Sequence, residues 1–162
     1  MYKSFFCLII VSLSLTLSSA SANLHRAPAF APRPSIDNVI DRAHALLGTP
    51  YKWGGTSVRQ GFDCSSFLVY LFKTEANIHL PRTTSEMHRS TAATIKRDAL
   101  QPGDAVFFRG NGRGQVSHVG LYIGEGKFIH SPRTGKSVRI DSLANSYWNK
   151  NYTTAKRFHA VR

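Results

Sequence analysis

The chain has 162 residues, and its 21 Lys and Arg outnumber its 9 Asp and Glu to give a net charge of +12. This length suits one domain with its own hydrophobic core, and two cysteines are too few for a miniature held together by disulfides. The excess of positive charge predicts attraction to polyanions.

A secretory leader is predicted over residues 1–22. Lys3 precedes an uncharged apolar run from Phe5 to Leu17, and small residues follow up to a cleavage site of the A-x-A type that ends at Ala22. The run is shorter than the roughly 20 apolar residues that a membrane span needs. We therefore expect cleavage after Ala22, no transmembrane segment in the mature chain, and export to the periplasm, the extracellular space or the cell wall.

Residues 23–34 are predicted to form a flexible linker, because three prolines stand there among Ala and Arg with little to bury. The domain itself is predicted over 35–162. Loss of Lys3 with the leader leaves a charge of +11 on the mature chain, and its basic residues are scattered rather than clustered. An exported chain meets anionic envelope polymers first, so we expect adhesion to these and no nucleic-acid partner. A merely solubilising surface is the alternative.

Two helices are predicted in the first part of the domain. Over residues 35–47 apolar side chains recur at helical spacing, and Ser35 is a suitable N-cap. After a glycine-rich loop, Asp63 precedes a compact apolar segment that is typical of a buried helix capped by this residue. Cys64 therefore lies in the first turn of the second helix.

A short helix is expected over 84–93, and beyond it the periodicity changes to that of strands. The predicted strands are 105–109, 117–123, 127–131, 137–140 and 156–161. Helices followed by a run of antiparallel strands predict an α+β fold rather than a doubly wound sheet.

Residues 117–131 form a predicted hairpin centred on Glu125, in which Gly120 lies opposite His130. Alternation then places His118 and His130 together on one face and the apolar side chains of both strands on the other. That apolar face contains Val119, Leu121, Ile123 and Ile129. Two histidines on one face suit a base backed by an orienting group, as in a catalytic triad.

Cys64 is the single cysteine of the predicted mature chain, so it has no internal disulfide partner. A thiol attacks as its thiolate, which a helix N-terminus or an adjacent imidazole favours. The free N–H groups of the first turn also suit an oxyanion. We therefore predict Cys64 as nucleophile, His118 as base and His130 as the third member.

Several short motifs follow one another along residues 36–162. They are Tyr51-Lys52-Trp53-Gly54-Gly55, Phe62-Asp63-Cys64-Ser65, Leu80-Pro81-Arg82, Gly103-Asp104, His118-Val119-Gly120-Leu121-Tyr122, Phe128-Ile129-His130 and Tyr147-Trp148. Each motif alone is weak, but the ordered set resembles the NlpC-type cell-wall cysteine peptidases. This family has a reduced papain-like fold, in which N-terminal helices pack on an antiparallel sheet.

The resemblance implies a role for each matching residue. Cys64 looks like the nucleophile, His118 like the general base, and His130 like the polar residue that orients the base. Tyr51 matches a family tyrosine near the nucleophile, and it is assigned with Ser65 to binding of substrate or oxyanion. The resemblance further implies peptidoglycan stem or cross-link peptides as substrate, often cut at bonds involving D-glutamate or diaminopimelate, and no metal or organic cofactor.

Two positions depart from the family pattern. Ser66 stands where glycine is usual, and Met87 stands where glutamine is usual. Neither change removes a catalytic group. We expect Ser66 to narrow the site and Met87 to shift contacts with the substrate.

Three other functions fit the same residues. Cys64, His118 and His130 are of the types that hold a catalytic zinc, although their spacing is not that of a compact metal motif. A wall-binding module without catalysis is the second, and an acyltransferase or amidase on a related scaffold is the third. In each case we expect the chain to act as a monomer.

Overall fold

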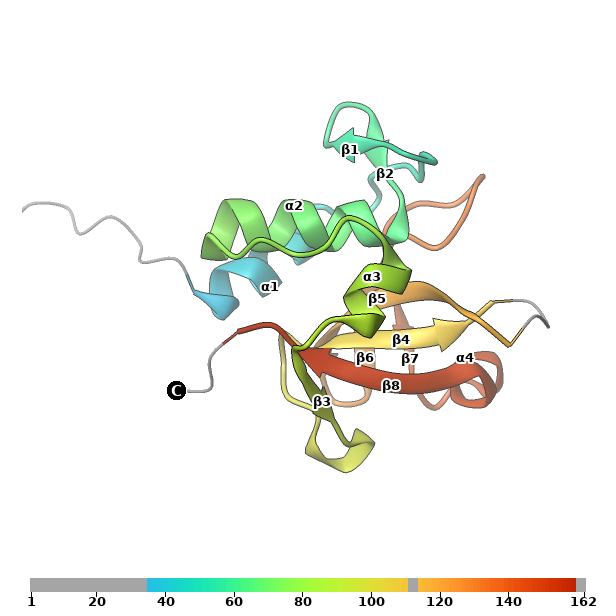
Figure 1. Ribbon diagram of the computed structural model, residues 1–162. Coiled ribbons are helices and arrows are strands. Elements are labelled where there is room, and N and C mark those ends of the chain that lie inside the picture. Colours follow the sequence, from blue (N-terminus) through green and yellow to red (C-terminus); the bar gives the residue numbers. More distant parts are fainter. Residues whose placement is uncertain (1–34, 111–113, 160–162) are drawn as a thin grey trace, which may run out of the picture. The chain divides into compact units, whose positions relative to one another are not determined.

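The computed structural model describes residues 35–110 and 114–159 (Figure 1). These residues form helices and antiparallel sheets, so the predicted α+β class is confirmed. The predicted leader (1–22) and linker (23–34) lie outside the described residues, as does the end of the predicted last strand.

Four α-helices and one 3-10 helix occur in the described part of the chain. They are α1 (Ile36–Ala45), α2 (Cys64–Ala76), α3 (Thr84–Arg89), η1 (Arg97–Ala99) and α4 (Ser146–Asn151). Ser35 caps α1 and Asp63 caps α2, as predicted. Helix α3 is shorter than the predicted 84–93, because the backbone of Ser90 is extended and ends it. Helix α4 was not predicted; it is short, and Asn145 caps it.

The strands are β1 (Thr56–Ser57), β2 (Gly61–Phe62), β3 (Ala93–Ile95), β4 (Ala105–Arg109), β5 (Val116–Gly124), β6 (Lys127–His130), β7 (Arg139–Ser142) and β8 (Tyr152–Arg157). β1 pairs with β2, and the other six form one antiparallel sheet in the order β3-β8-β4-β5-β6-β7. The predicted strand 137–140 is shifted along the chain in β7, and the predicted 156–161 begins earlier, in β8.

The β5–β6 hairpin has the predicted register, with Leu121 paired to Ile129. Its turn is not centred on Glu125 alone. Glu125 and Gly126 both have positive φ, 51° and 69°, which is the geometry of a two-residue turn. A register shift before Gly124 absorbs the difference, so the two histidines remain neighbours.

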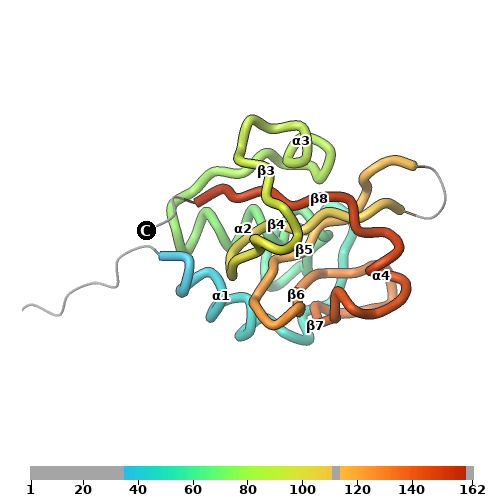
Figure 2. Tube along the Cα trace, turned by 90° about the horizontal axis from the view of Figure 1, so that it is seen from below, coloured from blue at the N-terminus to red at the C-terminus, as the bar shows by residue number. Residues whose placement is uncertain are grey.

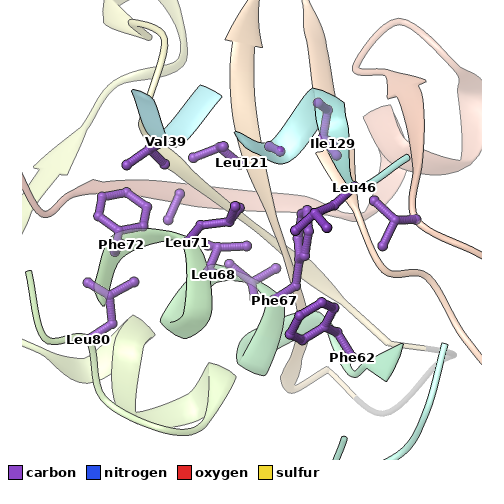
Figure 3. Packing of buried hydrophobic residues seen from close by; sticks show 14 of the residues in the cluster. Val39, Leu46, Phe62, Phe67, Leu68, Leu71, Phe72, Leu80, Leu121 and Ile129 are labelled. Carbon is purple, nitrogen blue, oxygen red and sulfur yellow. The ribbon is translucent and has the colours of Figure 1, made fainter. Parts of the chain in front are cut away.

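The main core lies between the helices and one face of the sheet, where α1 and α2 pack (Figures 1 and 3). Its labelled side chains in Figure 3 are Val39, Leu46, Phe62, Phe67, Leu68, Leu71, Phe72, Leu80, Leu121 and Ile129. Burial of each large apolar side chain contributes about 1.5–3 kcal/mol relative to exposure. This packing holds α2 against β5 and so fixes where its first turn lies.

A second cluster covers the other face of the sheet. It consists of Val106, Phe108, Phe128, Leu143 and Ala155, with Trp148 and Tyr152 packed against it. Alternate residues of β4 belong to the two clusters, as expected for a strand with both faces covered. Helix α4 lies beside β6 and β7 (Figure 2) and brings Trp148 to this face.

Asp104 of the Gly103-Asp104 motif is a structural residue. Its fully buried carboxylate accepts hydrogen bonds from Nε and Nη2 of Arg157 at 2.6 and 2.7 Å, which ties β8 to the start of β4. Removal of one partner from such a buried pair costs about 3–5 kcal/mol.

In the described part of the chain, no helix has the length and apolar character needed to cross a membrane.

Candidate active site

Cys64 is the first residue of α2, and a capping box fixes this turn. The carboxylate of Asp63 accepts a hydrogen bond from the Ser66 N–H at 2.7 Å, and Ser66 Oγ accepts one from the Asp63 N–H at 2.9 Å. The backbone at Cys64 is thereby held in one conformation. The thiol is presented from a rigid element, as a nucleophile requires.

The half-buried Cys64 thiol lies among hydrogen-bonding groups. Thr84 Oγ1 is 3.5 Å from Sγ, and the backbone N–H groups of Ser65 and Val119 point at the sulfur. Burial raises the pKa of the Cys64 thiol, and these hydrogen bonds offset the rise only in part. The sequence led us to expect a lowered pKa. Desolvation outweighs the helix N-terminus here, so at neutral pH the group is a thiol that needs a base.

His118 and His130 form the predicted pair. Nε2 of His118 is 2.7 Å from Nδ1 of His130, and the two rings are nearly perpendicular. His130 is fully buried, and the His118 ring stacks on Trp148 with a centroid distance of 5.4 Å. Gly120 permits this approach, because a Cβ there would lie 2.6 Å from the Phe128 ring and 3.3 Å from the His130 Cβ.

Both imidazoles are neutral at neutral pH. Burial, together with the neighbouring His130, lowers the pKa of His118 well below its ordinary value of 6.5. Burial also lowers the pKa of His130, although Asp141 opposes this. A neutral imidazole has a free lone pair, so the pair has the protonation state of a general base.

The thiol lies at the peptide bond that joins His118 to Val119, because the Val119 N–H points at Sγ. Cys64 packs with the main core, whereas His118 packs with the aromatic cluster of the other face. The thiol therefore lies against the backbone at the start of β5, the strand that carries His118. The side-chain hydrogen bond of the thiol goes to Thr84, which was not singled out in the sequence.

Asp141 and Trp148 complete the surroundings of the histidine pair. Asp141 Oδ2 is 2.9 Å from His130 Nε2 and accepts the Trp148 indole N–H, also at 2.9 Å. Trp148 occurs in a family motif, whereas Asp141 was missed because the predicted strand ended one residue before it. The available signal was a carboxylate on the neighbouring strand, two residues after the one that pairs with His130, where diagonal side chains contact each other.

The structure places Tyr51 near the nucleophile. Burial raises the pKa of Tyr51, and the ionisable side chains of Cys64 and Asp63 nearby raise it further. Ser65, the other residue assigned to substrate or oxyanion binding, uses its side chain in the cap of α2. Its buried hydroxyl donates to Asp63 at 3.0 Å and accepts from Arg82 at 3.0 Å, which leaves its backbone N–H for the sulfur.

The Leu80-Pro81-Arg82 motif is explained by the cap of α2. Arg82 Nη2 forms an ion pair with Asp63 Oδ2 at 2.9 Å. Burial opposes ionisation of Asp63, but the bond from Arg82 and those from Ser66 prevail and lower the pKa of the carboxyl. The capping group therefore stays ionised, and Arg82 anchors the segment that leads to Thr84.

Ser66 and Met87, the two departures from the family pattern, face inward. Ser66 Oγ donates to the Gly55 carbonyl at 2.5 Å and is buried with the cap. Met87 is fully buried in the main core. Neither side chain has the predicted role of narrowing the site or contacting the substrate, because both are used for packing and capping.

A cleft of about 600 Å³ opens beside His118. Three arginines line it, namely Arg109, Arg133 and Arg139, together with Asp141. Arg139 pairs with Asp141 at 2.8 Å, so the lining has an excess of positive charge.

The arrangement of Cys64, His118 and His130 bears on the zinc hypothesis. Over residues 35–110 and 114–159, no three His, Cys, Asp or Glu side chains are grouped so that they can hold a metal ion. Cys64 instead begins α2, and the His118 and His130 rings are hydrogen-bonded to each other.

Comparisons with known proteins agree with this geometry. The family model of the NlpC/P60 family matches residues 48–157. The chain is 52% identical over 148 residues to murein DD-endopeptidase MepH of Escherichia coli K12, which covers 91% of this chain and 54% of that protein. It is 39% identical over 158 residues to probable endopeptidase NlpC of the same organism, which covers 94% of this chain and 98% of that protein. The chain thus spans about half the length of MepH.

Among solved structures, the chain is similar to a crystal structure of an NlpC/P60 family protein from Bacillus cereus ATCC 10987. The TM-score is 0.72 at 39% sequence identity, over 78% of this chain and 41% of that one. The similarity therefore extends from sequence motifs to the arrangement of helices and sheet.

Proposed function

This chain belongs to the NlpC/P60 family, and we propose that it is a cysteine peptidase that hydrolyses peptide bonds in peptidoglycan. The observation that carries the proposal is that the Cys64 thiol takes a hydrogen bond from the backbone of Val119, the residue after His118, whose neutral imidazole is hydrogen-bonded to His130. A thiol and a neutral imidazole on rigid elements are the parts that covalent hydrolysis requires.

In the proposed mechanism His118 takes the proton of Cys64 as the thiolate attacks the carbonyl carbon of the scissile bond. His130 orients His118. The first turn of α2, which includes Ser65, supplies the N–H groups that stabilise the oxyanion, and Tyr51 lies near it. The proton on His118 then passes to the leaving amine, and water hydrolyses the thioester.

The substrate we propose is a stem or cross-link peptide, cut at a bond that involves D-glutamate or diaminopimelate. Such peptides carry several free carboxylates. The cleft beside His118 presents Arg109 and Arg133 in addition to the paired Arg139. Guanidinium groups bind carboxylates with two parallel hydrogen bonds, so this lining supports an anionic peptide as substrate.

The proposal includes the location and organisation of the protein. Residues 1–22 act as an export signal, 23–34 as a linker and 35–162 as the peptidase domain. The exported protein works as a monomer in the cell envelope, where its charge favours contact with anionic polymers.

Digestion of purified peptidoglycan, with mass analysis of the soluble fragments, tests the function. We expect fragments that differ by cleavage within the peptides, together with loss of activity after alkylation of Cys64 and full activity in the presence of a chelator. Release of sugar chains without peptide would indicate an amidase. Binding without release would indicate a wall-binding module, and inhibition by the chelator alone would indicate a zinc enzyme.

A further inference from the structure

Asp141 on β7 accepts more hydrogen bonds than its role in the strand requires. Its Oδ2 lies 2.9 Å from His130 Nε2, 2.9 Å from the Trp148 indole nitrogen, and 2.8 and 3.1 Å from two nitrogens of Arg139. In the β6–β7 ladder His130 is opposite Arg139, so Asp141 is its diagonal neighbour on the same face. Every partner of this oxygen lies in or beside the catalytic pair.

These contacts determine where the protons of both imidazoles are. Burial opposes ionisation of Asp141, but hydrogen bonds from His130 and Arg139 lower its pKa to about 2. At neutral pH the carboxylate is therefore ionised and can only accept hydrogen bonds. His130 Nε2 must then carry a proton. Since His130 is neutral, its Nδ1 has a lone pair, and the 2.7 Å contact requires a proton on His118 Nε2. His118 is neutral as well, which leaves its Nδ1 unprotonated.

We propose that Asp141 is a positioning residue, which fixes the tautomers of His130 and His118 so that Nδ1 of His118 is the atom that receives the Cys64 proton. This inference rests on the proposed cysteine-peptidase function. When the Sγ–H bond breaks and the Nδ1–H bond forms, His118 becomes an imidazolium whose Nε2–H still donates to His130. Asp141 stays ionised throughout and stabilises that positive charge through His130.

Trp148 adds a second, mechanical part to the role of Asp141. Its indole ring stacks on His118 with an interplanar angle of 28° and meets His130 edge-on at 5.0 Å. The hydrogen bond from the indole nitrogen to Asp141 therefore fixes the position of the ring against which both imidazoles pack. One carboxylate thus fixes the protons and the orientation of the pair.

The direct test is ¹⁵N NMR of the histidine rings in the free, full-length protein. In the wild type we expect Nε2 protonated and Nδ1 unprotonated in both His118 and His130. Asp141→Leu removes the acceptor and should give mixed tautomers, whereas Asp141→Asn keeps an acceptor oxygen and should keep the wild-type pattern. Asp98→Leu, at an exposed carboxylate on η1, is the matched control.

Kinetics give a second readout. Loss of the outer partner of a metal-ligating histidine costs about 10–100-fold in affinity or activity, and by analogy Asp141→Leu should lower kcat by this order with little change in KM. Asp141→Asn should recover part of the loss but move the acid limb of kcat/KM to lower pH, because the missing charge raised the pKa of both imidazoles. The charged or titratable groups that line the cleft with His118 are Arg109 on β4, Arg133 after β6, Arg139 and Asp141 on β7 and Tyr147 on α4, while His130 on β6 contacts the His118 ring directly.

Wild-type tautomers and kcat in Asp141→Leu would overturn the proposal, and so would an acid limb that does not move in Asp141→Asn. If Asp141→Leu does not fold, Asp141→Asn alone tests the proposal, through the pH dependence of its kcat/KM and the protonation of its histidine ring nitrogens. The NMR measurement needs no substrate. A wild-type protein with the expected tautomers but no hydrolysis would therefore refute the proposed function and not the role of Asp141.

Discussion

Cys64 and His118 are both uncharged at neutral pH, because burial raises the pKa of the thiol and lowers that of the imidazole. In the proposed mechanism the proton moves during attack, when the N–H groups of Ser65 and Val119 are already in place to stabilise the sulfur anion. A neutral, desolvated thiol also resists oxidation better than an exposed thiolate.

Loss of His118 tests whether the two groups act as one unit. His118→Ala should lower turnover of a soluble peptidoglycan peptide by about 10²–10⁴-fold, the usual contribution of a general base. Adding Cys64→Ala to this variant should cost no more than Cys64→Ala alone, since residues of one catalytic unit are not additive. A double variant far slower than either single variant would show that the residues act separately.

The depressed pKa of His118 predicts the acid side of the pH profile. The base is lost when His118 becomes protonated, and that occurs as pH falls through a folded-state pKa well below 6.5. kcat/KM measured from pH 4 to pH 8 should therefore remain high at pH 6.5 and fall only at lower pH. His44→Gln, at an exposed histidine of α1, should leave the profile unchanged. A midpoint at or above 6.5 is the contrary result.

The residues of the site were predictable to different degrees. Cys64, His118 and His130 follow from a helix start, a strand period and a turn, all of which are local signals. Asp141 is a partner of His130 only because β7 pairs with β6 in one particular register. The pairing register of β6 and β7 has to be known before this contact can be inferred, so the periodicity of each strand alone did not supply it.

At the scale of elements, the start of α2 depends on the hydroxyl of Ser66. This hydroxyl bonds the Asp63 N–H and the Gly55 carbonyl, both in the buried region of the cap. Ser66→Ala leaves these groups without that partner, so we expect a loss of about 1–3 kcal/mol in the free energy of unfolding. Urea denaturation measures it.

Thr74→Ala is the matched control for Ser66→Ala. Thr74 is on the same helix, but its hydroxyl is exposed and bonds only within the helix. Its replacement should change stability by no more than about 0.5 kcal/mol. Equal stability losses in the two variants would mean that the buried hydrogen bonds of the cap contribute no more to the free energy of unfolding than an exposed one.

The hairpin and the sheet differ in how far sequence determines them. The β5–β6 register follows from a period of two and from Glu125-Gly126, so it was predicted apart from the form of the turn. The position of β8 between β3 and β4 was not predicted, because this pairing brings together segments that are far apart in the chain. Helix α4 was missed because six residues are too few to show a helical period.

At the scale of the whole molecule, the positive charge predicts salt-dependent adhesion to peptidoglycan sacculi. Scattered, exposed charges are screened once the Debye length falls to about 10 Å, near 0.1 M salt. We expect binding to weaken steadily from 10 mM to 500 mM NaCl. A Cys64→Ala protein should be used in this sedimentation assay, so that the sacculi are not digested. Binding that is independent of salt would mean that contacts in the cleft, and not the scattered surface charges, hold the protein on the sacculi.

The central claim is that hydrolysis proceeds through the Cys64 thiol, and replacement of this residue tests it most directly. Peptide release from purified peptidoglycan is to be measured for the wild type and for Cys64→Ala at equal concentration, with thermal unfolding to verify that both are folded. The account predicts release by the wild type and none above background by Cys64→Ala. Release by a folded Cys64→Ala protein at a rate near that of the wild type would contradict it.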